Sequence, residues 1–143
     1  MPSGARDTAR TMSEENVEAL KRAFAAASDR DTYEQLLTIL DEDIVWDPGE
    51  TFPGGKEYGH DGVRSFFRSW IGTFEEWGFE PVEYRDCGNA VFVHMHQWGR
   101  GKGSGATTEI DLWQVWLFFE GKVVRFVQKP SREHALEAAG LSE

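Results

Sequence analysis

The residues best suited to chemistry, Asp47 and His60, flank a loop that is rich in glycine and proline. Asp47 follows Trp46 at the end of an expected short strand, which Pro48 terminates. A carboxylate beside Trp46 in an apolar pocket mouth has a raised pKa, which suits a base that moves protons near neutral pH. His60 opens the next expected helix and can supply an acid/base partner if the loop folds back. The alternatives are an aspartate that caps the next turn and a histidine that caps the helix and anchors the loop.

Two glutamines, Gln97 and Gln114, lie in strands that are otherwise largely apolar. A buried amide without partners costs about 1–3 kcal/mol, so each must be hydrogen-bonded or must face a polar ligand atom. One interpretation is that they pair with each other or with the backbone. The other is that they orient a carbonyl or hydroxyl group of a ligand.

Large flat side chains are numerous: aromatic residues make up 13% of the chain, with 6 Trp and 10 Phe. Such a composition predicts either a cavity with aromatic walls or a solid, densely packed core. If a cavity exists, its expected lining comes from strands and helices on both sides of the loop. The candidates are Trp46, Tyr58, Phe66, Trp70, Met95 and Trp116, together with the two glutamines.

Other local patterns do not predict a metal or cofactor site. His94 and His96 follow Gly88 with the spacing that opens a cupin metal motif, but the acidic residue that such a motif needs next is absent. We therefore expect two exposed or interface histidines. The glycine-rich segment 99–105 joins two strands and precedes no helix, so it is not a phosphate-binding loop. Cys87 is the only cysteine, which excludes an intramolecular disulfide and fits a reducing cytoplasm.

The charge of the chain narrows the classes of partner. Its 143 residues suit a single domain, and the formal net charge is -10 at pH 7. This charge disfavours binding to nucleic acids and to anionic membranes. No apolar run approaches the about 20 residues that span a bilayer, and residues 1–10 lack the apolar stretch of a signal peptide. The sequence thus predicts a cytoplasmic protein without a membrane or nucleic-acid partner.

The periodicity of apolar residues changes along the chain from helical to strand-like. Residues 1–12 are polar and aperiodic and are expected to form a disordered tail, with Met12 as an alternative start; residues 13–143 form the domain. The expected helices are 14–28 after a Ser13 cap, a second helix capped by Asp31, 60–77, and 131–139 after a Ser131 cap. The expected strands are 43–47, 79–86, 90–98, 107–119 and 122–129. This order predicts an α+β fold with a curved, mostly antiparallel sheet wrapped around three N-terminal helices.

Several strings, in this order, resemble the SnoaL-like, nuclear-transport-factor-two-like superfamily: SEENVEALKRAF, ILDEDIVWDP, GHDGVRSFF, VFVHMHQWGRGKGSG and WQVWLFFEGKVVRF. The resemblance covers residues 13 to about 139 and implies a cone-shaped domain. It also implies that the sheet face carrying Met95 and Gln114 lines a cavity. In ketosteroid isomerases of this superfamily an Asp-Pro at the position of Asp47 supplies the general base.

The chain departs from the isomerase pattern at the two groups that stabilise the oxyanion. Ala23 or Phe24 stands where the resemblance would place a tyrosine, and Gln114 stands near the position of a protonated aspartate. Steroid isomerisation is therefore not expected. The Arg-x-Asp motif of the related epoxide hydrolases is also missing, since Glu109-x-Asp111 lacks the arginine.

Two functions remain as hypotheses. The first is a cofactor-independent isomerase, cyclase or dehydratase that acts on a small apolar carbonyl compound, with Asp47 as base and His60 as helper. The second is a non-catalytic module that binds a small ligand or associates as a dimer. Because the outer sheet face would hold Phe92, Trp98 and Trp113, we expect a homodimer through that face.

Overall fold

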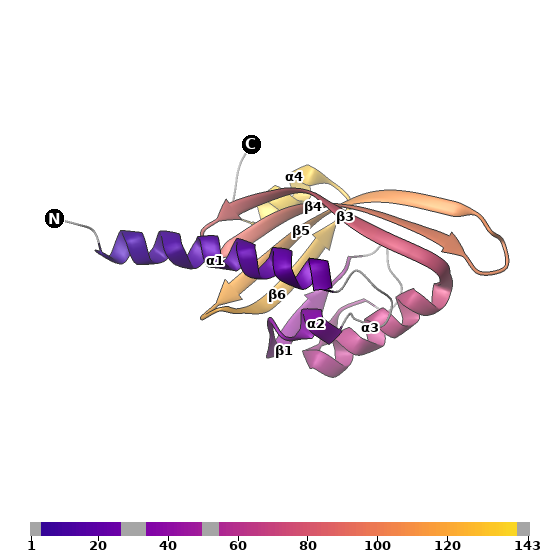
Figure 1. Ribbon diagram of the computed structural model, residues 1–143, viewed down its shortest axis with the longest axis horizontal. Helices are drawn as coiled ribbons and strands as arrows, with labels where there is room; N and C mark the ends of the chain where they lie inside the picture. The colour runs from indigo at the N-terminus through magenta and orange to yellow at the C-terminus, as the bar shows by residue number, and fades with distance from the viewer. Residues whose placement is uncertain (1–3, 27–33, 50–54, 140–143) are drawn as a thin grey trace.

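The computed structural model describes residues 4–26, 34–49 and 55–139 (Figure 1). A six-stranded sheet in the order β2-β1-β6-β5-β4-β3 forms its centre, and four helices flank it. The strands are β1 (Leu40–Asp47), β2 (Glu57–Tyr58), β3 (Phe74–Cys87), β4 (Ala90–Gly101), β5 (Thr107–Phe119) and β6 (Lys122–Lys129). The helices are α1 (Gly4–Ala26), α2 (Glu34–Leu37), α3 (Gly59–Thr73) and α4 (Arg132–Ala138). The prediction of an α+β fold with a curved sheet is confirmed.

Hairpins connect the four long strands in sequence. The β3–β4 and β5–β6 turns place Gly88 at φ 80° and Gly121 at φ 82°, backbone angles that glycine adopts without strain. Every neighbouring pair is antiparallel except β1 and β6, which run parallel because the chain crosses over between them. The sheet is thus mostly antiparallel, as the sequence predicts.

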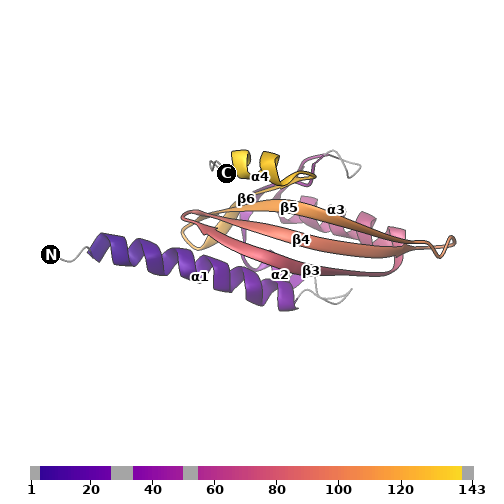
Figure 2. The same cartoon turned by 90° about the horizontal axis from the view of Figure 1, so that it is seen from above.

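The two faces of the sheet are covered by different helices (Figures 1 and 2). On the concave face, side chains of β1 and β4 to β6 pack with α1, α2 and α3 into the main hydrophobic core. On the outer face, Ala135 and Leu136 of α4 pack on Phe92 and Val115 in a second, smaller core. Ser131 caps α4, since its hydroxyl accepts a hydrogen bond from the backbone N–H of His134, which confirms the predicted cap.

The first helix is longer than the sequence predicts. The start expected at residue 14 is wrong, because α1 begins at Gly4, within the segment 1–12 for which a disordered tail is expected. No glycine or proline interrupts the chain from residue 5 to Ala26, and its Ala, Arg and Glu residues favour helix. Ser13 therefore lies inside the helix and is buried, instead of capping it. The Asp31 cap expected for the second helix lies outside the described residues.

The third helix is shorter than predicted, because α3 ends at Thr73 and the next residues open β3. Phe74 and Trp77 are paired with Gly101 and Gly99 of β4. Gly99 leaves the space that the Phe74 ring fills, since a Cβ at this position would lie 2.5 Å from that ring. The aromatic residues continue the helical spacing to Trp77, although strand pairing begins at Phe74.

The outer sheet face is partly covered within the chain itself. Phe92, which we expected to face a second copy, is fully buried beneath α4. Trp113 is only partly buried and stacks on His94, with ring centroids 4.8 Å apart. Among the described residues, no helix is both long and apolar enough to cross a lipid bilayer.

Candidate functional site

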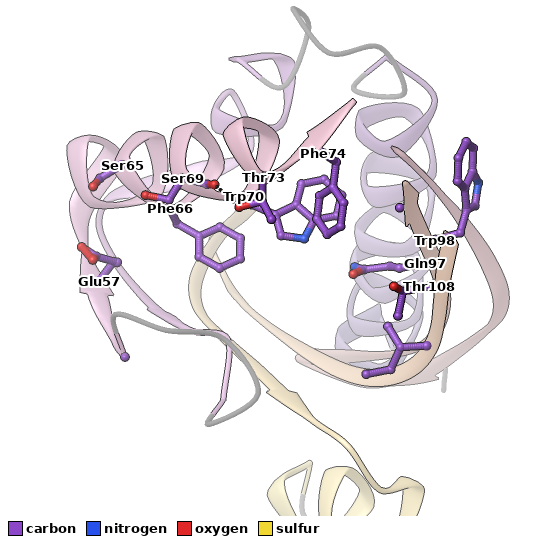
Figure 3. A pocket seen from close by; sticks show the side chains of 13 residues that line it. Glu57, Ser65, Phe66, Ser69, Trp70, Thr73, Phe74, Gln97, Trp98 and Thr108 are labelled. Carbon is purple, nitrogen blue, oxygen red and sulfur yellow. Dashed lines mark hydrogen bonds between the residues drawn. The ribbon is translucent and has the colours of Figure 1, made fainter. Parts of the chain in front are cut away.

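A pocket of about 450 Å³ lies between α3 and the ends of β4 and β5 (Figure 3). Phe66 and Trp70 point into it from α3, and Gln97 faces them from β4. Hydroxyl side chains surround these aromatic rings, so the pocket has an apolar centre and a polar margin. The remaining lining residues are Gly55, Glu57, Ser65, Ser69, Thr73, Phe74, Trp98, Gly99, Thr108 and Ile110.

A smaller recess of about 60 Å³ lies next to this pocket. Phe66, Trp70 and Gln97 line both spaces, so the recess adjoins the pocket at these three side chains. Its walls are aromatic and its polar groups are amides. They comprise Phe24, Leu36, Trp46, Phe67, Phe79, Met95, Gln114, Trp116, Phe126 and Gln128.

Aromatic contacts hold the recess walls in place. Trp46 stacks on Phe126 with ring centroids 4.0 Å apart, because parallel pairing of β1 with β6 sets these residues side by side. Trp116 meets Trp46 edge to face at 5.7 Å, and Phe66 lies 5.7 Å from Trp46. Offset and edge-to-face pairs of this kind stabilise a fixed arrangement of rings. The recess is thus a feature of the packed core.

A chain of buried hydrogen bonds links side chains of the recess wall to one another and to the backbone. The Trp116 indole N–H donates to Gln114 Oε1 at 3.0 Å, and Gln114 Nε2 donates to Gln128 Oε1 at 2.8 Å. Gln128 Nε2 then donates to the carbonyl oxygen of Pro48 at 3.1 Å. An indole can only donate and a carbonyl can only accept, so the two ends fix the orientation of both amides.

Trp46 differs from Trp116 in one respect. Its side chain is buried and lines the recess, but its indole N–H has no hydrogen-bond acceptor among the described residues. Buried donors in folded proteins nearly always have partners, because an unpaired one keeps the full cost of losing water. Trp46 therefore carries a buried donor that has no partner among the described residues, and its side chain forms part of the recess wall.

The SnoaL-like domain family matches residues 20–126, a range that holds both pocket walls. The chain belongs to the SnoaL-like family. Solved structures share its fold: TerC co-crystallised with polyporic acid is 24% identical, with a TM-score of 0.72 over 88% of this chain and 98% of that chain. A nuclear-transport-factor-two-like protein from Burkholderia xenovorans is 28% identical, with a TM-score of 0.68 over 88% and 95%.

A third solved structure carries a ketosteroid-isomerase-like fold. It is a hypothetical protein from Catenulispora acidiphila in complex with trimethylamine, 15% identical to this SnoaL-like chain, with a TM-score of 0.68 over 88% and 92% of the two chains. The chain has no match among curated protein sequences.

The candidate base of this SnoaL-like chain does not reach the pocket. Along β1 successive side chains alternate between faces, so Trp46 points inward and Asp47 outward. Asp47 is paired with Val127 of the outer core, and it lines a separate pocket of about 300 Å³ under the end of α4. Its Oδ1 accepts a hydrogen bond from the N–H of Gly49 at 3.3 Å. Asp47 thus lines neither the larger pocket nor the recess, and its contact is that of an aspartate that closes a turn.

His60 anchors the start of α3. Its Nε2 lies 2.9 Å from the carbonyl oxygen of Leu40, at the opposite end of β1 from Asp47. This contact fits the alternative in which His60 anchors the loop and the helix start. Tyr58 is 66% exposed and lines neither the pocket nor the recess, because it lies on the short edge strand β2.

The other expected lining residues are brought together. Trp46, Met95, Gln114 and Trp116 surround the recess, and Gln97 lies at its junction with the larger pocket. The partner of Gln114 is Gln128 instead of Gln97. Gln128 and Phe126 were missed, although they lie two positions apart and share one face of β6. A glutamine two positions after a phenylalanine in an apolar strand is the signal that identifies such a residue.

Ionisable groups are scarce in this site. Among the described residues, Glu57 alone contributes a titratable carboxylate to the larger pocket, and none lines the recess. In the same part of the chain, no group of three or more His, Cys, Asp or Glu residues is arranged to hold a metal ion. The site thus offers hydrogen bonding and apolar contact.

Charged groups gather instead on the outer sheet face. Asp111 Oδ1 lies 3.0 Å from His94 Nε2 and 3.2 Å from His96 Nδ1, and Glu109 Oε1 lies 2.9 Å from His96 Nε2. The hydrogen bonds to Glu109 and then Asp111 raise the pKa of His96. The hydrogen bonds to His94 and then His96 lower the pKa of Asp111. We call these four residues the outer histidine cluster.

Proposed function

We propose that this SnoaL-like protein binds a small, largely apolar organic molecule in the pocket between α3 and the sheet. The observation that carries the proposal is an aromatic hollow that leads to a recess with buried amides. Ligand sites combine a mostly apolar concave lining with a few placed polar groups, in volumes of about 300–1,000 Å³. The larger pocket, at about 450 Å³, lies in this range.

The margin of the pocket supports a ligand with more than one polar group. Ser65, Ser69 and Thr73 follow one face of α3 at helical spacing, and Thr108 lies across from them on β5 (Figure 3). Hydroxyl groups both donate and accept hydrogen bonds, so they suit varied polar substituents. The ring faces of Phe66 and Trp70 suit a flat hydrocarbon body.

Binding is favoured over the reactions considered for the sequence. Acid–base isomerisation, cyclisation or dehydration needs a titratable group within hydrogen-bond reach of the reacting atoms. Asp47 and His60 lie elsewhere, and Glu57 is the single carboxylate among the described pocket residues. TerC and the Catenulispora acidiphila protein were each crystallised with a small molecule, which fits a ligand-binding role for this fold.

Two further expectations remain predictions. One is a homodimer through the outer sheet face, where Trp113 packs beside the core under α4 but stays only partly buried. The other is a cytoplasmic location. Chromatography with light scattering would test the first of these, because a monomer at micromolar concentration would contradict it.

A blocking substitution tests ligand binding. Ser69→Phe places a ring in the pocket from an exposed position of α3, whereas Arg68→Phe on the same helix adds a ring outside the pocket. The compounds are a set of aromatic ketones that includes 2-acetonaphthone. We expect ketones to raise the melting temperature of the wild type and of Arg68→Phe but not of Ser69→Phe. The absence of any compound with this pattern would contradict the proposal.

A further inference from the structure

We infer that the recess recognises a hydrogen-bond acceptor, the carbonyl oxygen at the leading end of the ligand, and that the indole N–H of Trp46 donates to it. This inference rests on the proposed function, since it requires a ligand in the adjoining pocket. The ligand would then be a compound with a carbonyl group, and the carbonyl end would enter before the apolar body.

The direction of the buried hydrogen bonds decides which groups remain free. Gln114 and Gln128 each use one N–H within the chain, and the oxygen of each already accepts one bond. Within the described part of the chain, each amide nitrogen therefore keeps a second hydrogen that has no assigned acceptor. Together with the indole N–H of Trp46, these hydrogens form a group of donors without assigned acceptors. The amide oxygens need no second partner, because a carbonyl oxygen that accepts a single hydrogen bond is well tolerated.

Trp46 is the strongest of these donors for a ligand. Unlike the amides, it has only one hydrogen to give, and that hydrogen has no acceptor among residues 4–26, 34–49 and 55–139. A buried unpaired donor lowers stability in the empty protein and regains the lost hydrogen bond when an acceptor arrives. No described cation or carboxylate lines the recess, so a neutral acceptor suits it better than an ionised group.

The volumes set the orientation of the ligand. A dry cavity of about 150 Å³ in a protein core holds one benzene ring. The recess, at about 60 Å³, is too small for a ring but large enough for a carbonyl group. The ring system must then remain in the pocket of about 450 Å³, against Phe66 and Trp70 at the junction. A flat ketone would thus enter with its carbonyl first.

The test compares two probes that differ in the acceptor alone, 2-acetonaphthone and 2-ethylnaphthalene. One hydrogen bond to a buried donor predicts an affinity about tenfold higher for the ketone in the wild type. Trp46→Phe should remove this preference, so that the ratio of the two affinities falls to about one. Trp116→Phe is the matched control, since Trp116 also lines the recess but its N–H is already bonded to Gln114. It should keep the preference.

A second measurement does not depend on the stability of a variant. In a ¹⁵N-labelled protein, 2-acetonaphthone should move the indole N–H resonance of Trp46 downfield, and 2-ethylnaphthalene should not. Equal affinity for both probes in the wild type, or an unmoved Trp46 resonance in the ketone complex, would overturn the inference and leave the proposed function intact. The absence of any ligand that binds the wild type and that Ser69→Phe excludes would instead count against the proposed function itself.

Discussion

Strands β4 and β5 carry two polar clusters on opposite faces, and the contrast between them is instructive. On the concave face, Gln97 and Gln114 are neutral and adjoin an aromatic recess. On the outer face, the same strands carry the outer histidine cluster, which is charged and partly exposed. Because side chains alternate along a strand, neighbours in sequence lie in environments of different polarity. On the buried face, neutral amides cost less free energy to remove from water than charged groups would. On the outer face, the charged side chains stay in contact with water.

The two clusters also differ in what they contribute. The hydrogen-bond partners of the buried amides have few alternative partners in the core. Removing an amide should therefore lower the free energy of unfolding and alter ligand binding. Ion pairs at an exposed surface gain little net energy, since water screens them and their side chains lose mobility. The comparison thus predicts large, pH-independent effects in the pocket and small, pH-dependent effects outside.

The largest effect should come from Gln114→Leu. This substitution leaves the N–H of Trp116 and the Oε1 of Gln128 without partners in the core. Each unsatisfied group costs about 1–3 kcal/mol, so the free energy of unfolding should fall by several kcal/mol. Urea denaturation measures it, and Gln35→Leu on the exposed surface of α2 is the matched control. A loss no larger than that of the control would mean that the chain of hydrogen bonds is not maintained.

A smaller effect, with a defined pH dependence, should come from His96→Gln. Because the pKa of His96 is raised from 6.5, its protonated form stabilises the fold; this contribution is complete below pH 6.5 and disappears as pH rises through the raised value. The pKa of Asp111 is lowered from 3.8, so its contribution is lost only as pH falls through that lower value. His96→Gln should therefore reduce the melting temperature more at pH 5.5 than at pH 8.5.

The control for the outer cluster is His134→Gln on α4, for which no carboxylate partner is assigned among the described residues. It should show no such pH dependence. Ketone affinity measured in parallel should stay constant over the same range, because no described residue of the recess titrates there. A ketone affinity that follows the His96 profile would mean that the two faces are coupled.

The smallest effect should come from Asp47→Asn. The asparagine keeps an oxygen for the N–H of Gly49, and the side chain lies in the pocket under α4. We expect the affinity for 2-acetonaphthone and the melting temperature to match those of the wild type. A marked loss of affinity, measured by titration of tryptophan fluorescence, would return Asp47 to the ligand site and remove the distinction between the two faces.

Much of the candidate site could be predicted from period and composition. The alternation that groups the side chains on each strand face is a local property of β structure, and the family resemblance assigned the face with Met95 and Gln114 to the concave side, where both side chains lie. Phe66 and Trp70 lie one helical turn apart, so their common direction also follows from sequence. Gln128 was within reach of the same reasoning, since it shares its strand face with Phe126.

The failures concern positions where two distant segments meet. Asp47 has the neighbours of a catalytic base in sequence, but the face it occupies depends on the register of β1 against β6. A shift of one residue would exchange the directions of Trp46 and Asp47. The partner of His60 depends likewise on where the start of α3 meets β1. Neither register is encoded in the local spacing of residues.

The sequence by itself determined the order of the elements, the amphipathic faces of the strands and the SnoaL-like fold that these imply, because such features arise from interactions within short segments. Tertiary structure alone decided that Asp47 faces outward and that α4 covers Phe92. It also decided that the indole N–H of Trp116 has a hydrogen-bond partner, whereas that of Trp46 has none in the described part of the chain. These outcomes depend on pairing across the sheet and on the space left between packed rings. The sequence alone specifies neither the strand pairing nor the space between the rings, because both depend on contacts between distant segments.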